Sequence, residues 1–569
     1  MANRSRKVVI VGGNACGMKT AARLRRRDPE AEITVVEKGA FLSYGACGFP
    51  YYISGMVPKH TGLMNTPLGV IRDADFFNTV KGVRVLTHTE AVRIDRQNKT
   101  VEAVDRGKGE TMHLAYDCLV LATGGAPVVP EMEGRSGVQG VFTVSSMDDA
   151  IGIRGYIDQH EVEKVVIAGG GYIGMETTEG LADRGLQVTI IKTSSRLLPA
   201  MLDTEIQLLI SRYMQQQGVH ILSNDSVARL CADSRGMLKS VVTEKGTEVP
   251  ADLLLVTKGI RPSVGLAREA GLELGETGGV RVGPCMQTSD PCIYAGGDCV
   301  ENKHLLTGKK IQAAMGSIAN LHGRVIADCI AGDSEQFPGV LGTGIFKIFD
   351  YTVAATGLTE QEAQRSGYEA VSSIVPGADK PHFYQGAKPI IIKLVADGKS
   401  GRVLGAQIFG SGDVAKRIEI VVTALTCGAT VDQLSNLNLA YSPPFSPAID
   451  NIITAAHVLG NKMTGTARSL SPLEVKQKFD QGDDFVYLDV RSPGEFERER
   501  IDHPSVVLLP LSKLRSEPPD IGRNAEIVVG CKSSLRAYEA QRILQAQGFQ
   551  NVRFMDGGIL AWPFDLYRS

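Results

Sequence analysis

The sequence lacks any run of eighteen apolar residues, and its short basic start leads directly into an apolar strand without a small-residue cleavage site. A membrane-spanning helix needs such a run, and a secretory signal needs such a site. The chain also lacks an excess of charge of one sign, because its formal net charge is -2. We therefore expect neither a membrane nor a nucleic acid as a partner.

Cysteine pairs at metal-binding spacing are also missing. The ten cysteines are scattered, and none belongs to a C-x-x-C pair. This pattern argues against a zinc site and against a disulfide framework. We expect no bound metal, and we expect a thiol-reducing, cytoplasmic compartment.

Cys47 has no second cysteine among the dozen residues that follow it, so it cannot form a disulfide with a near neighbour. It lies in the stretch Gly45-Ala46-Cys47-Gly48-Phe49-Pro50. Any sulfur that bonds to it must come from elsewhere. The alternative is a buried structural thiol, which is the usual fate of a free cysteine.

Length and composition favour a multidomain α/β protein. A chain of 569 residues is too long for one hydrophobic core and should form roughly three to five domains. Glycine is abundant, with 63 residues, and 43% of the chain is hydrophobic. This composition suits many tight turns between strands and helices.

The first pattern with chemical meaning begins at Lys7. An apolar strand at residues 8–11 leads into a glycine turn and a helix, and a second strand, at residues 33–36, ends in an acidic residue. The order is typical of a dinucleotide site, in which the turn admits a pyrophosphate and the acid accepts bonds from ribose hydroxyls. Asn14 replaces the usual middle glycine. The candidate binding residues are Gly12, Gly13, Ala15, Gly17, Glu37 and Lys38.

A second and complete G-x-G-x-x-G turn follows the strand at residues 165–168. Its candidate residues are Gly169, Gly171, Tyr172, Ile173 and Gly174. Two such units predict a hydride donor and a hydride acceptor.

The nucleotide preference of the second unit is left open between NADH and NADPH. Lys192 ends the next strand, where an NAD-specific site would place an acid. It could pair with the 2′-phosphate of NADPH, helped by Arg196, or it could be a solvated lysine.

Two later segments, residues 118–125 and 288–298, contain the turn Thr123-Gly124 and the aspartate Asp298. Together with the first glycine turn they resemble the FAD-binding fingerprints of the pyridine nucleotide-disulfide oxidoreductases. The resemblance implies FAD, with Asp298 at the ribityl chain. It also implies that Tyr172 covers the flavin until nicotinamide displaces it.

The pattern Ser43-x-x-x-Cys47-Gly48-x-Pro50-Tyr51 resembles the fused coenzyme A disulfide reductase and rhodanese flavoproteins. The resemblance implies that coenzyme A is bound as a substrate or cofactor, with its pantetheine arm reaching Cys47. The positions that match its phosphate anchors are Arg23, Arg26, Ser43, Asn302 and Lys303. The alternative for the two arginines is a solvated basic helix face.

Residues 342–459 resemble the interface domain of the same family, which implies a homodimer whose partner subunit completes each active site. The resemblance places Tyr441, and Tyr384 as a second tyrosine, at the catalytic sulfur. A phenol can protonate a leaving thiolate. The alternative for both tyrosines is a packed interface aromatic.

The C-terminal segment contains the run Phe485-Val486-Tyr487-Leu488-Asp489-Val490-Arg491 and the loop Cys531-Lys532-Ser533-Ser534-Leu535-Arg536-Ala537. These motifs resemble a rhodanese domain. Cys531 lies between a predicted strand and a helix, where amides and the helix dipole stabilise a thiolate or persulfide. The resemblance makes Arg536 a guide for anionic sulfur donors. Ser534 stands where the usual loop has glycine. The alternative is an inactive docking module.

The predicted fold is therefore α/β, with two Rossmann-like domains, an α+β dimerisation domain and a rhodanese domain. The boundaries are 1–150 with 275–335 for FAD, 151–274 for NAD(P)H, 336–460 for dimerisation, 461–470 for a linker and 471–569 for rhodanese.

The predicted function is NAD(P)H-dependent reduction of coenzyme A disulfide, coenzyme A persulfide or polysulfide at Cys47, with Cys531 delivering sulfane sulfur and sulfide released. Two alternatives stay open. One is an oxidase or peroxidase that holds Cys47 as a sulfenic acid. The other is a sulfur-relay or redox-sensing protein.

Overall fold

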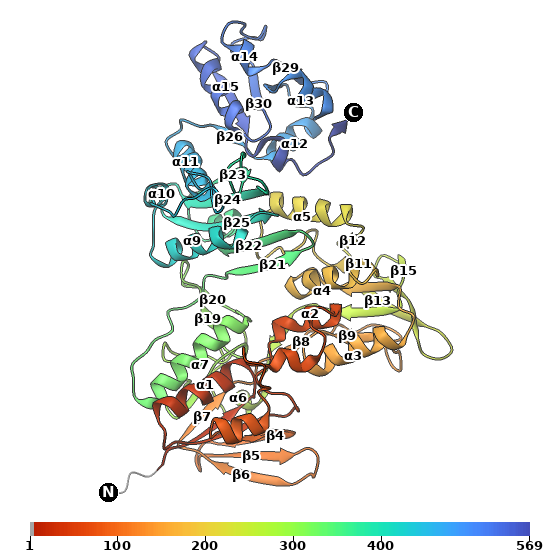
Figure 1. Cartoon of the computed structure of the whole chain (residues 1–569), viewed down its shortest axis with the longest axis vertical. Coiled ribbons are helices and arrows are strands. Elements are labelled where there is room, and N and C mark those ends of the chain that lie inside the picture. Colours follow the sequence, from red (N-terminus) through yellow and green to blue (C-terminus); the bar gives the residue numbers. More distant parts are fainter. Residues whose placement is uncertain (1–4) are drawn as a thin grey trace. The chain divides into compact units, whose positions relative to one another are not determined.

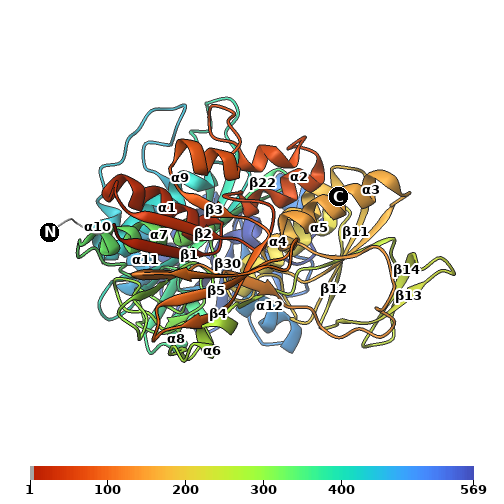
Figure 2. The same cartoon turned by 90° about the horizontal axis from the view of Figure 1, so that it is seen from below.

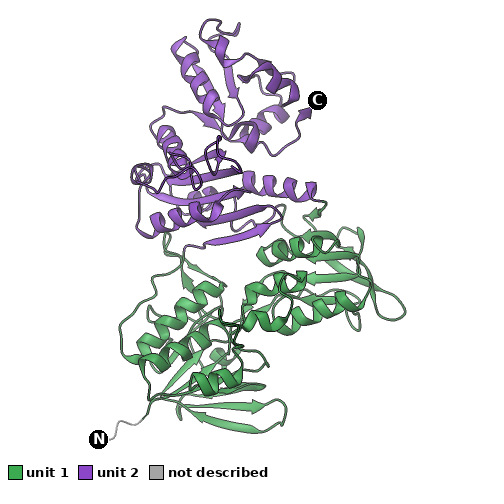
Figure 3. Cartoon of the chain, viewed as in Figure 1, with its two compact units in different colours: residues 1–195, 218–340 green, residues 196–217, 341–569 purple. Residues whose placement is uncertain are grey.

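The computed structural model describes residues 5–569 of the chain. It forms two compact units, one made of residues up to 195 and 218–340, and the other of residues 196–217 and 341–569 (Figure 3). Within 5–569, no helix is long and apolar enough to cross a membrane. The mixed α/β fold predicted from the sequence is confirmed.

The first unit begins with a parallel five-stranded sheet in the order β18-β7-β1-β2-β3. Its central strand consists of buried Val and Ile residues, as expected where helices cover both faces. Helices α1 and α7 lie side by side along it (Figures 1 and 2). The bounds are β1 Lys7–Val11, β2 Glu32–Val36, β3 Arg84–Leu86, β7 Cys118–Leu121, β18 Ile293–Ala295, α1 Ala15–Arg27 and α7 Gly316–Ala331.

The second sheet of this unit is also parallel, in the order β12-β11-β10-β16-β9. A three-stranded antiparallel sheet accompanies each parallel one. The second parallel sheet comprises β9 Val141–Thr143, β10 Lys164–Ala168, β11 Gln187–Lys192, β12 His220–Ser223 and β16 Leu253–Val256, with helices α3 Met147–Gln159 and α4 Tyr172–Ala182. The antiparallel sheets are β4 Thr89–Asp95, β5 Thr100–Asp105 and β6 Thr111–Ala115, and β13 Val227–Ala232, β14 Leu238–Thr243 and β15 Glu248–Pro250.

The second unit contains an antiparallel sheet in the order β21-β22-β25-β24-β23. Strands β24 and β25 are almost entirely buried. The elements are β21 Gly344–Ile348, β22 Tyr351–Gly357, β23 Ala370–Ala378, β24 Pro389–Asp397, β25 Val403–Gly410, α8 Glu360–Arg365, α9 Val414–Thr426, α10 Val431–Ser435 and α11 Asn451–Met463.

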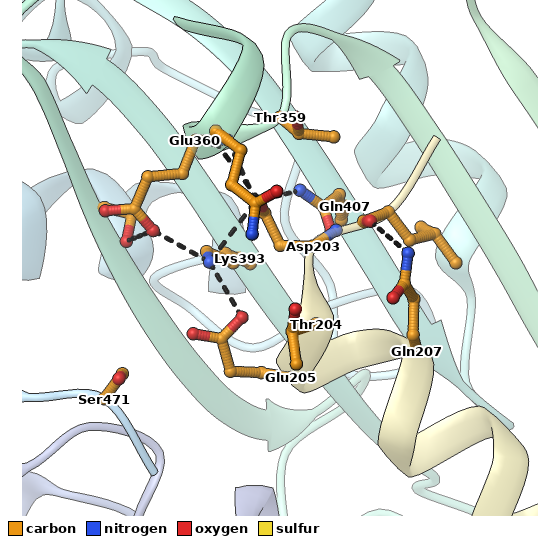
Figure 4. Close-up of polar contacts among 12 residues, drawn as sticks. Asp203, Thr204, Glu205, Gln207, Thr359, Glu360, Lys393, Gln407 and Ser471 are labelled. Carbon is orange, nitrogen blue, oxygen red and sulfur yellow. Dashed lines mark hydrogen bonds and ion pairs between the residues drawn. The ribbon is translucent and has the colours of Figure 1, made fainter. Parts of the chain in front are cut away.

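Helix α5 (Thr204–Gln216) belongs to this second unit, although residues 151–274 are predicted as the nucleotide domain. A buried charge cluster accounts for the difference. The Lys393 ammonium, on β24, is 1% exposed and lies 3.3, 3.1 and 2.9 Å from carboxylates of Asp203, Glu205 and Glu360 (Figure 4). Asp203 and Glu205 come from the start of α5, so the cluster joins this helix to the interface sheet.

The rhodanese-like part of the second unit is a parallel sheet in the order β26-β31-β30-β27-β29. The segment 461–470, predicted as a linker, holds the last residues of α11 and the short strand β26. The remaining elements are β26 Ser469–Leu470, β27 Val486–Asp489, β29 Val506–Leu508, β30 Glu526–Gly530, β31 Asn551–Met555, α12 Pro472–Gln481, α13 Pro493–Arg498, α14 Leu511–Leu514 and α15 Leu535–Ala546.

Candidate active site

The first glycine turn has the shape that a bound pyrophosphate requires. Gly12 has a φ of +114°, and a Cβ there would lie 2.1 Å from the carbonyl oxygen of Ala122. At Gly17 a Cβ would lie 1.9 Å from the carbonyl oxygen of Gly12, so helix α1 packs directly on the turn. Neither position accepts a side chain. Ala15 is the first residue of α1, and no acidic residue lies in its first turn.

Glu37 and Asp298 frame this turn. The Gly13 amide donates to Glu37 Oε2 at 2.7 Å, which places the carboxylate beside the turn as predicted for a ribose contact. Lys38 follows it along the chain. Asp298 lies after β18, and burial raises the pKa of its carboxyl. Within 5–569 no residue donates a hydrogen bond to the Asp298 carboxylate. This fits an aspartate that accepts hydrogen bonds from hydroxyl groups of FAD.

The Thr123-Gly124 turn lies at the carboxyl end of β7, the strand next to β1. The Thr123 hydroxyl donates to the carbonyl of Ser263 at 2.6 Å, and Gly124 has a φ of +67°. The carboxyl ends of parallel strands at a crevice are the usual place for a dinucleotide.

The second glycine turn has the same construction. A Cβ at Gly169 would lie 2.4 Å from the Thr257 carbonyl oxygen, and one at Gly174 would lie 2.8 Å from the Gly169 carbonyl oxygen. Gly171, in contrast, is the N-cap of α4, and a Cβ there would meet no atom within 4 Å. Because this side is open, a pyrophosphate can approach the helix N-terminus. Tyr172 and the half-exposed Ile173 follow it at the start of the helix.

Lys192 is not a solvated lysine. It is 2% exposed at the end of β11, and its ammonium donates to the carbonyl of Ser194 at 2.9 Å. Arg196 lies in the other unit and its guanidinium contacts Thr204. The Lys192 ammonium is therefore buried and hydrogen-bonded within the protein, which does not favour its predicted contact with the 2′-phosphate of a bound nucleotide.

Cys47 is exposed and lies in the 3₁₀ turn η1 (Ala46–Gly48). A Cβ at Gly316, the first residue of α7, would come within 3.9 Å of its sulfur, so the sulfur faces that helix N-terminus. Packing around the sulfur and the charge of Glu176 raise the pKa of the Cys47 thiol, and backbone amides of Cys47 and Gly316 act in the opposite direction. The helix end supplies a local countercharge for the thiolate.

Two residues next to Cys47 come from different elements and have no site role predicted from the sequence. The Tyr51 hydroxyl, on α2 (Phe49–Ser54), lies 3.3 Å from Glu176 Oε1, on α4. Burial raises the pKa of Glu176 to about 7 and that of Tyr51 to about 12. The pKa of Tyr172 is also raised, by burial and then by Glu176. Glu176 is therefore close in space to both the second glycine turn and the Cys47 segment.

A basic cavity of about 400 Å³ opens beside Ser43. Its wall includes one face of α1, and four of its side chains are cationic. The charged and polar lining residues are Asn14, Lys19, Arg26, Ser43, Thr66, Arg72, Lys81 and Asn320.

Three of the five predicted coenzyme A anchors do not line this cavity. Arg23 pairs with Asp328 on α7 at 2.7 Å, so it joins the two helices. Asn302 is buried in the short strand β19 (Asn302–Lys303), and Lys303 is exposed beside it. The other cationic residues that line the cavity are Lys19, Arg72 and Lys81. Lys19 shares α1 with Arg26, whereas Arg72 and Lys81 come from a later segment whose approach to α1 has no local signal in the sequence.

The two predicted tyrosines lie in loops of the second unit. Tyr441 is 51% exposed and Tyr384 38%, with Phe383 and Phe445 also exposed near them in the sequence. The Lys380 ammonium lies 6.0 Å from the centre of the Tyr384 ring. Neither tyrosine is buried within its own chain.

Cys531 is buried between β30 and α15 and is 1% exposed. Burial raises the pKa of its thiol, while amides of Ser533, Ala537 and Ser534 and the charge of Arg536 lower it. Ser534 has a φ of +77°, which explains why glycine is usual there. Arg536 forms two 2.8 Å bonds to Glu495 and lowers the pKa of that carboxyl to about 2. Arg536, which the resemblance predicts to attract anionic sulfur donors, is therefore already paired with the Glu495 carboxylate.

Comparison with known proteins decides the family. The family model for pyridine nucleotide-disulphide oxidoreductases matches residues 6–319, its dimerisation domain matches 344–453, and the rhodanese-like domain matches 471–563. The chain belongs to the pyridine nucleotide-disulphide oxidoreductases. This oxidoreductase thus has the FAD-dependent and NAD(P)H-dependent architecture predicted from its motifs.

Three relatives of this oxidoreductase are informative. An NAD(P)H sulfur oxidoreductase (CoA-dependent) of Pyrococcus furiosus is 37% identical over 80% of this chain and 99% of that protein. An NAD-dependent persulfide reductase from A. fulgidus has a structure with a TM-score of 0.92 at 43% identity, covering 98% of this chain and 100% of that one. Reduced Bacillus anthracis CoADR-RHD has a TM-score of 0.91 at 32% identity, covering 98% of each chain.

The position of Glu176 near the second glycine turn could have been predicted from the sequence of this oxidoreductase. It follows Tyr172 by four residues on α4, and residues at that spacing share a helix face. Glu495 was also within reach, as the capping-box partner of Ser492 at the start of α13. The contact of Glu495 with Arg536 spans 41 residues and had no sequence signal.

Proposed function

We propose that this chain is an NAD(P)H-dependent reductase of coenzyme A persulfide, polysulfide and coenzyme A disulfide, and that Cys47 is its redox-active sulfur. The observation that carries the proposal is the placement of Cys47, whose exposed sulfur lies at the N-terminus of α7. The charge of Glu176, on the helix after the second glycine turn, acts on the Cys47 thiol and on the Tyr172 hydroxyl. The names of the relatives agree with this chemistry.

In the proposed reaction, bound FAD would supply the electron pair of NAD(P)H for reduction of the sulfur bonded to Cys47. The residues that would hold FAD are Gly12, Gly13, Gly17, Glu37 and Asp298, and the turn at Gly169 would hold the nicotinamide nucleotide beside Tyr172. The Cys47 thiolate attacks the sulfur of the substrate, with the amide of Gly316 favouring the anion.

The basic cavity is proposed to hold the phosphates of coenzyme A. We expect Arg26→Glu to raise KM for coenzyme A disulfide on the order of tenfold with little change in kcat, because it removes binding shared by ground and transition state. Steady-state kinetics with coenzyme A disulfide and with inorganic polysulfide measures this. Arg84→Glu, an exposed arginine outside the cavity, is the matched control. An equal KM increase in both variants would contradict the assignment.

We further propose a homodimer in which Tyr384 and Tyr441 serve the Cys47 site of the other copy. Their exposure and that of Phe383 and Phe445 support an interface role. The phenols would protonate the departing thiolate. A cytoplasmic location is proposed as well, since all ten cysteines are free.

Cys531 is proposed to collect sulfane sulfur and hand it toward Cys47, directly or through coenzyme A. With a thiosulfate or persulfide donor, Cys531→Ser should lower sulfide release on the order of tenfold or more, while turnover of coenzyme A disulfide stays unchanged. Sulfide and NAD(P)H are measured together in one reaction. Cys427→Ser, at an exposed cysteine, is the control.

The same assay separates the alternatives. A sulfur reductase couples nucleotide oxidation to sulfide, and this coupling is the expected result. Nucleotide consumption under air without sulfide would favour the oxidase. Persulfide transfer to a second protein without nucleotide consumption would favour a sulfur relay, and either outcome would overturn the proposal.

A further inference from the structure

The loop that carries Cys531 is held from one side by the segment at residues 556–560. Two backbone amides of this segment donate to the carbonyl oxygens of Cys531 and Lys532, at 3.0 and 3.1 Å. A Cβ at Gly558 would lie 2.4 Å from the same Cys531 oxygen, so the backbones of the segment and the loop are in direct contact. A displacement of segment 556–560 must therefore move the Cys531 loop as well.

The same segment is anchored on its other side to the interface domain. Asp556 follows β31 and is 2% exposed, and the ammonium of Lys462, in the last turn of α11, lies 2.7 Å from its Oδ2. At the next position, a Cβ at Gly557 would lie 3.0 Å from Cγ2 of Ile374, which belongs to β23. Segment 556–560 is therefore fixed between the interface domain and the Cys531 loop.

The buried Asp556 carboxylate depends on the Lys462 ammonium. Burial raises the pKa of Asp556, and the charge of Lys462 acts in the opposite direction. Removal of the ammonium would leave the carboxylate buried without its ion-pair partner, which is costly in a protein interior. The carboxylate would then move toward water or bind a proton, and in both cases the ion pair that joins segment 556–560 to α11 is lost.

We propose that Lys462 and Asp556 are positioning residues for sulfur transfer at Cys531, because their ion pair lets the interface domain hold the Cys531 loop in the shape that accepts sulfur. This inference rests on the proposed role of Cys531 in collecting sulfane sulfur. It needs no contribution from Cys47.

The sulfur-accepting step shows why the shape of the loop matters. The Cys531 thiolate attacks one sulfur of a polysulfide anion, so that a bond from Cys531 to sulfur forms and a sulfur–sulfur bond of the donor breaks. The shortened polysulfide leaves with the electron pair, and the new persulfide is itself an anion. Burial raises the pKa of the Cys531 thiol, and the amide of Ser533 is the first of the loop groups that lower it. Such amides favour both anions only while the loop keeps its shape.

Persulfidation of Cys531 tests this proposal in the full-length, FAD-bound protein. Inorganic polysulfide is added without NAD(P)H, and mass spectrometry follows the Cys531 peptide across the pH range in which a thiol ionises. Lys462→Met should take up sulfur on the order of tenfold more slowly at neutral pH. The midpoint of its pH profile should also lie higher than in wild type, because misaligned amides favour the thiolate less. Lys462→Arg keeps a cation beside Asp556 and should restore most of the rate.

Lys478→Met is the matched control. The Lys478 side chain is 17% exposed, as is that of Lys462, and its ammonium pairs with Asp483 at 2.8 Å and with Glu526 at 3.1 Å. This variant removes ion pairs of the same domain without touching segment 556–560. Its rate of persulfidation and its pH midpoint should match those of wild type. Turnover of coenzyme A disulfide should be unchanged in all three lysine variants, which checks that each chain is folded.

Trp562, the only tryptophan of the chain, reports on the same segment independently. It is 4% exposed, and its amide donates to the carbonyl oxygen of Ile559 at 3.2 Å. Quenching of its fluorescence by acrylamide should increase in Lys462→Met, because a displaced segment exposes the indole to the quencher. It should not increase in Lys478→Met.

The outcomes separate this inference from the proposed function. If Lys462→Met takes up sulfur with the wild-type rate and pH midpoint, or if Lys478→Met loses as much as Lys462→Met, the positioning role is wrong. Unchanged quenching of Trp562 in a slow Lys462→Met would also contradict it. Wild-type sulfide release by Cys531→Ser would instead reject the proposed role of Cys531, whatever Lys462→Met shows.

Discussion

Cys47→Ser should lose turnover of coenzyme A disulfide and persulfide by a factor on the order of 10³ or more. The hydroxyl of serine cannot form the covalent bond to sulfur on which the proposed exchange depends. It also stays protonated across the accessible pH range, so the α7 N-terminus has no anion to stabilise. Stopped-flow absorbance and steady-state assays with each sulfur substrate measure the loss.

The variant should still fold and bind its cofactors. Serine is close in size to cysteine and position 47 is exposed, so the free energy of unfolding should change by less than about 1 kcal/mol. Reduction of bound flavin by NAD(P)H should persist in Cys47→Ser, because it precedes the sulfur chemistry. Turnover within a few-fold of wild type would remove Cys47 from the mechanism.

The pH dependence of wild-type turnover follows from the direction of the Cys47 shift. Packing and Glu176 raise the pKa of this thiol, so the reactive thiolate is lost as pH falls and gained as pH rises. The raised pKa of Glu176, about 7, means that its own protonation begins near neutrality. Because the charge of Glu176 acts on the Cys47 thiol, ionisation of Glu176 also contributes to the acidic limb of the profile.

Much of the fold was accessible from the sequence because local signals and the tertiary structure agree. The runs of buried Val and Ile in β1 and β10 each precede a glycine turn, and both strands are central in their parallel sheets. The sequence predicts Cys531 between a strand and a helix, and β30 and α15 confirm it. In each case residues close together in the sequence determine the element.

The differences arise where contacts join distant residues. The sequence predicts α5 in the same domain as its neighbours, yet Lys393, nearly two hundred residues later, draws Asp203 and Glu205 into the second unit. Arg23 matches a family position, but Asp328 on α7 holds its guanidinium. The cavity beside α1 shows the same effect, because the cationic side chains that line it come from segments well separated in the sequence.

Removing the buried Lys393 ammonium should strongly destabilise the second unit, because three carboxylates surround it. Burial acts to lower the pKa of this ammonium, but the charges of Glu205, Asp203 and Glu360 outweigh it and raise the pKa. Gln407 donates to Asp203 Oδ2 at 2.6 Å but carries no charge. Without the ammonium, three carboxylates would lie together with no countercharge.

Lys393→Met should therefore destabilise the second unit by about 3–5 kcal/mol, the usual cost of removing one partner from a buried ion pair. Calorimetry should show its transition on the order of 10 °C lower. Lys399→Met is the matched control, because Lys399 pairs with Glu369 at 3.7 Å on the exposed surface and such pairs contribute about 0–1 kcal/mol.

The pH dependence distinguishes charge from lost packing. Because the pKa of Lys393 is raised, its contribution is complete at neutral pH and is lost only as pH rises through the folded value. In Lys393→Met the deficit should shrink as pH falls, since protonation of the carboxylates removes their repulsion. Adding Asp203→Asn, Glu205→Gln and Glu360→Gln to Lys393→Met should restore most of the stability at pH 7. A deficit that is independent of pH and is not rescued would assign the loss to the missing lysine stem rather than to unpaired buried charge.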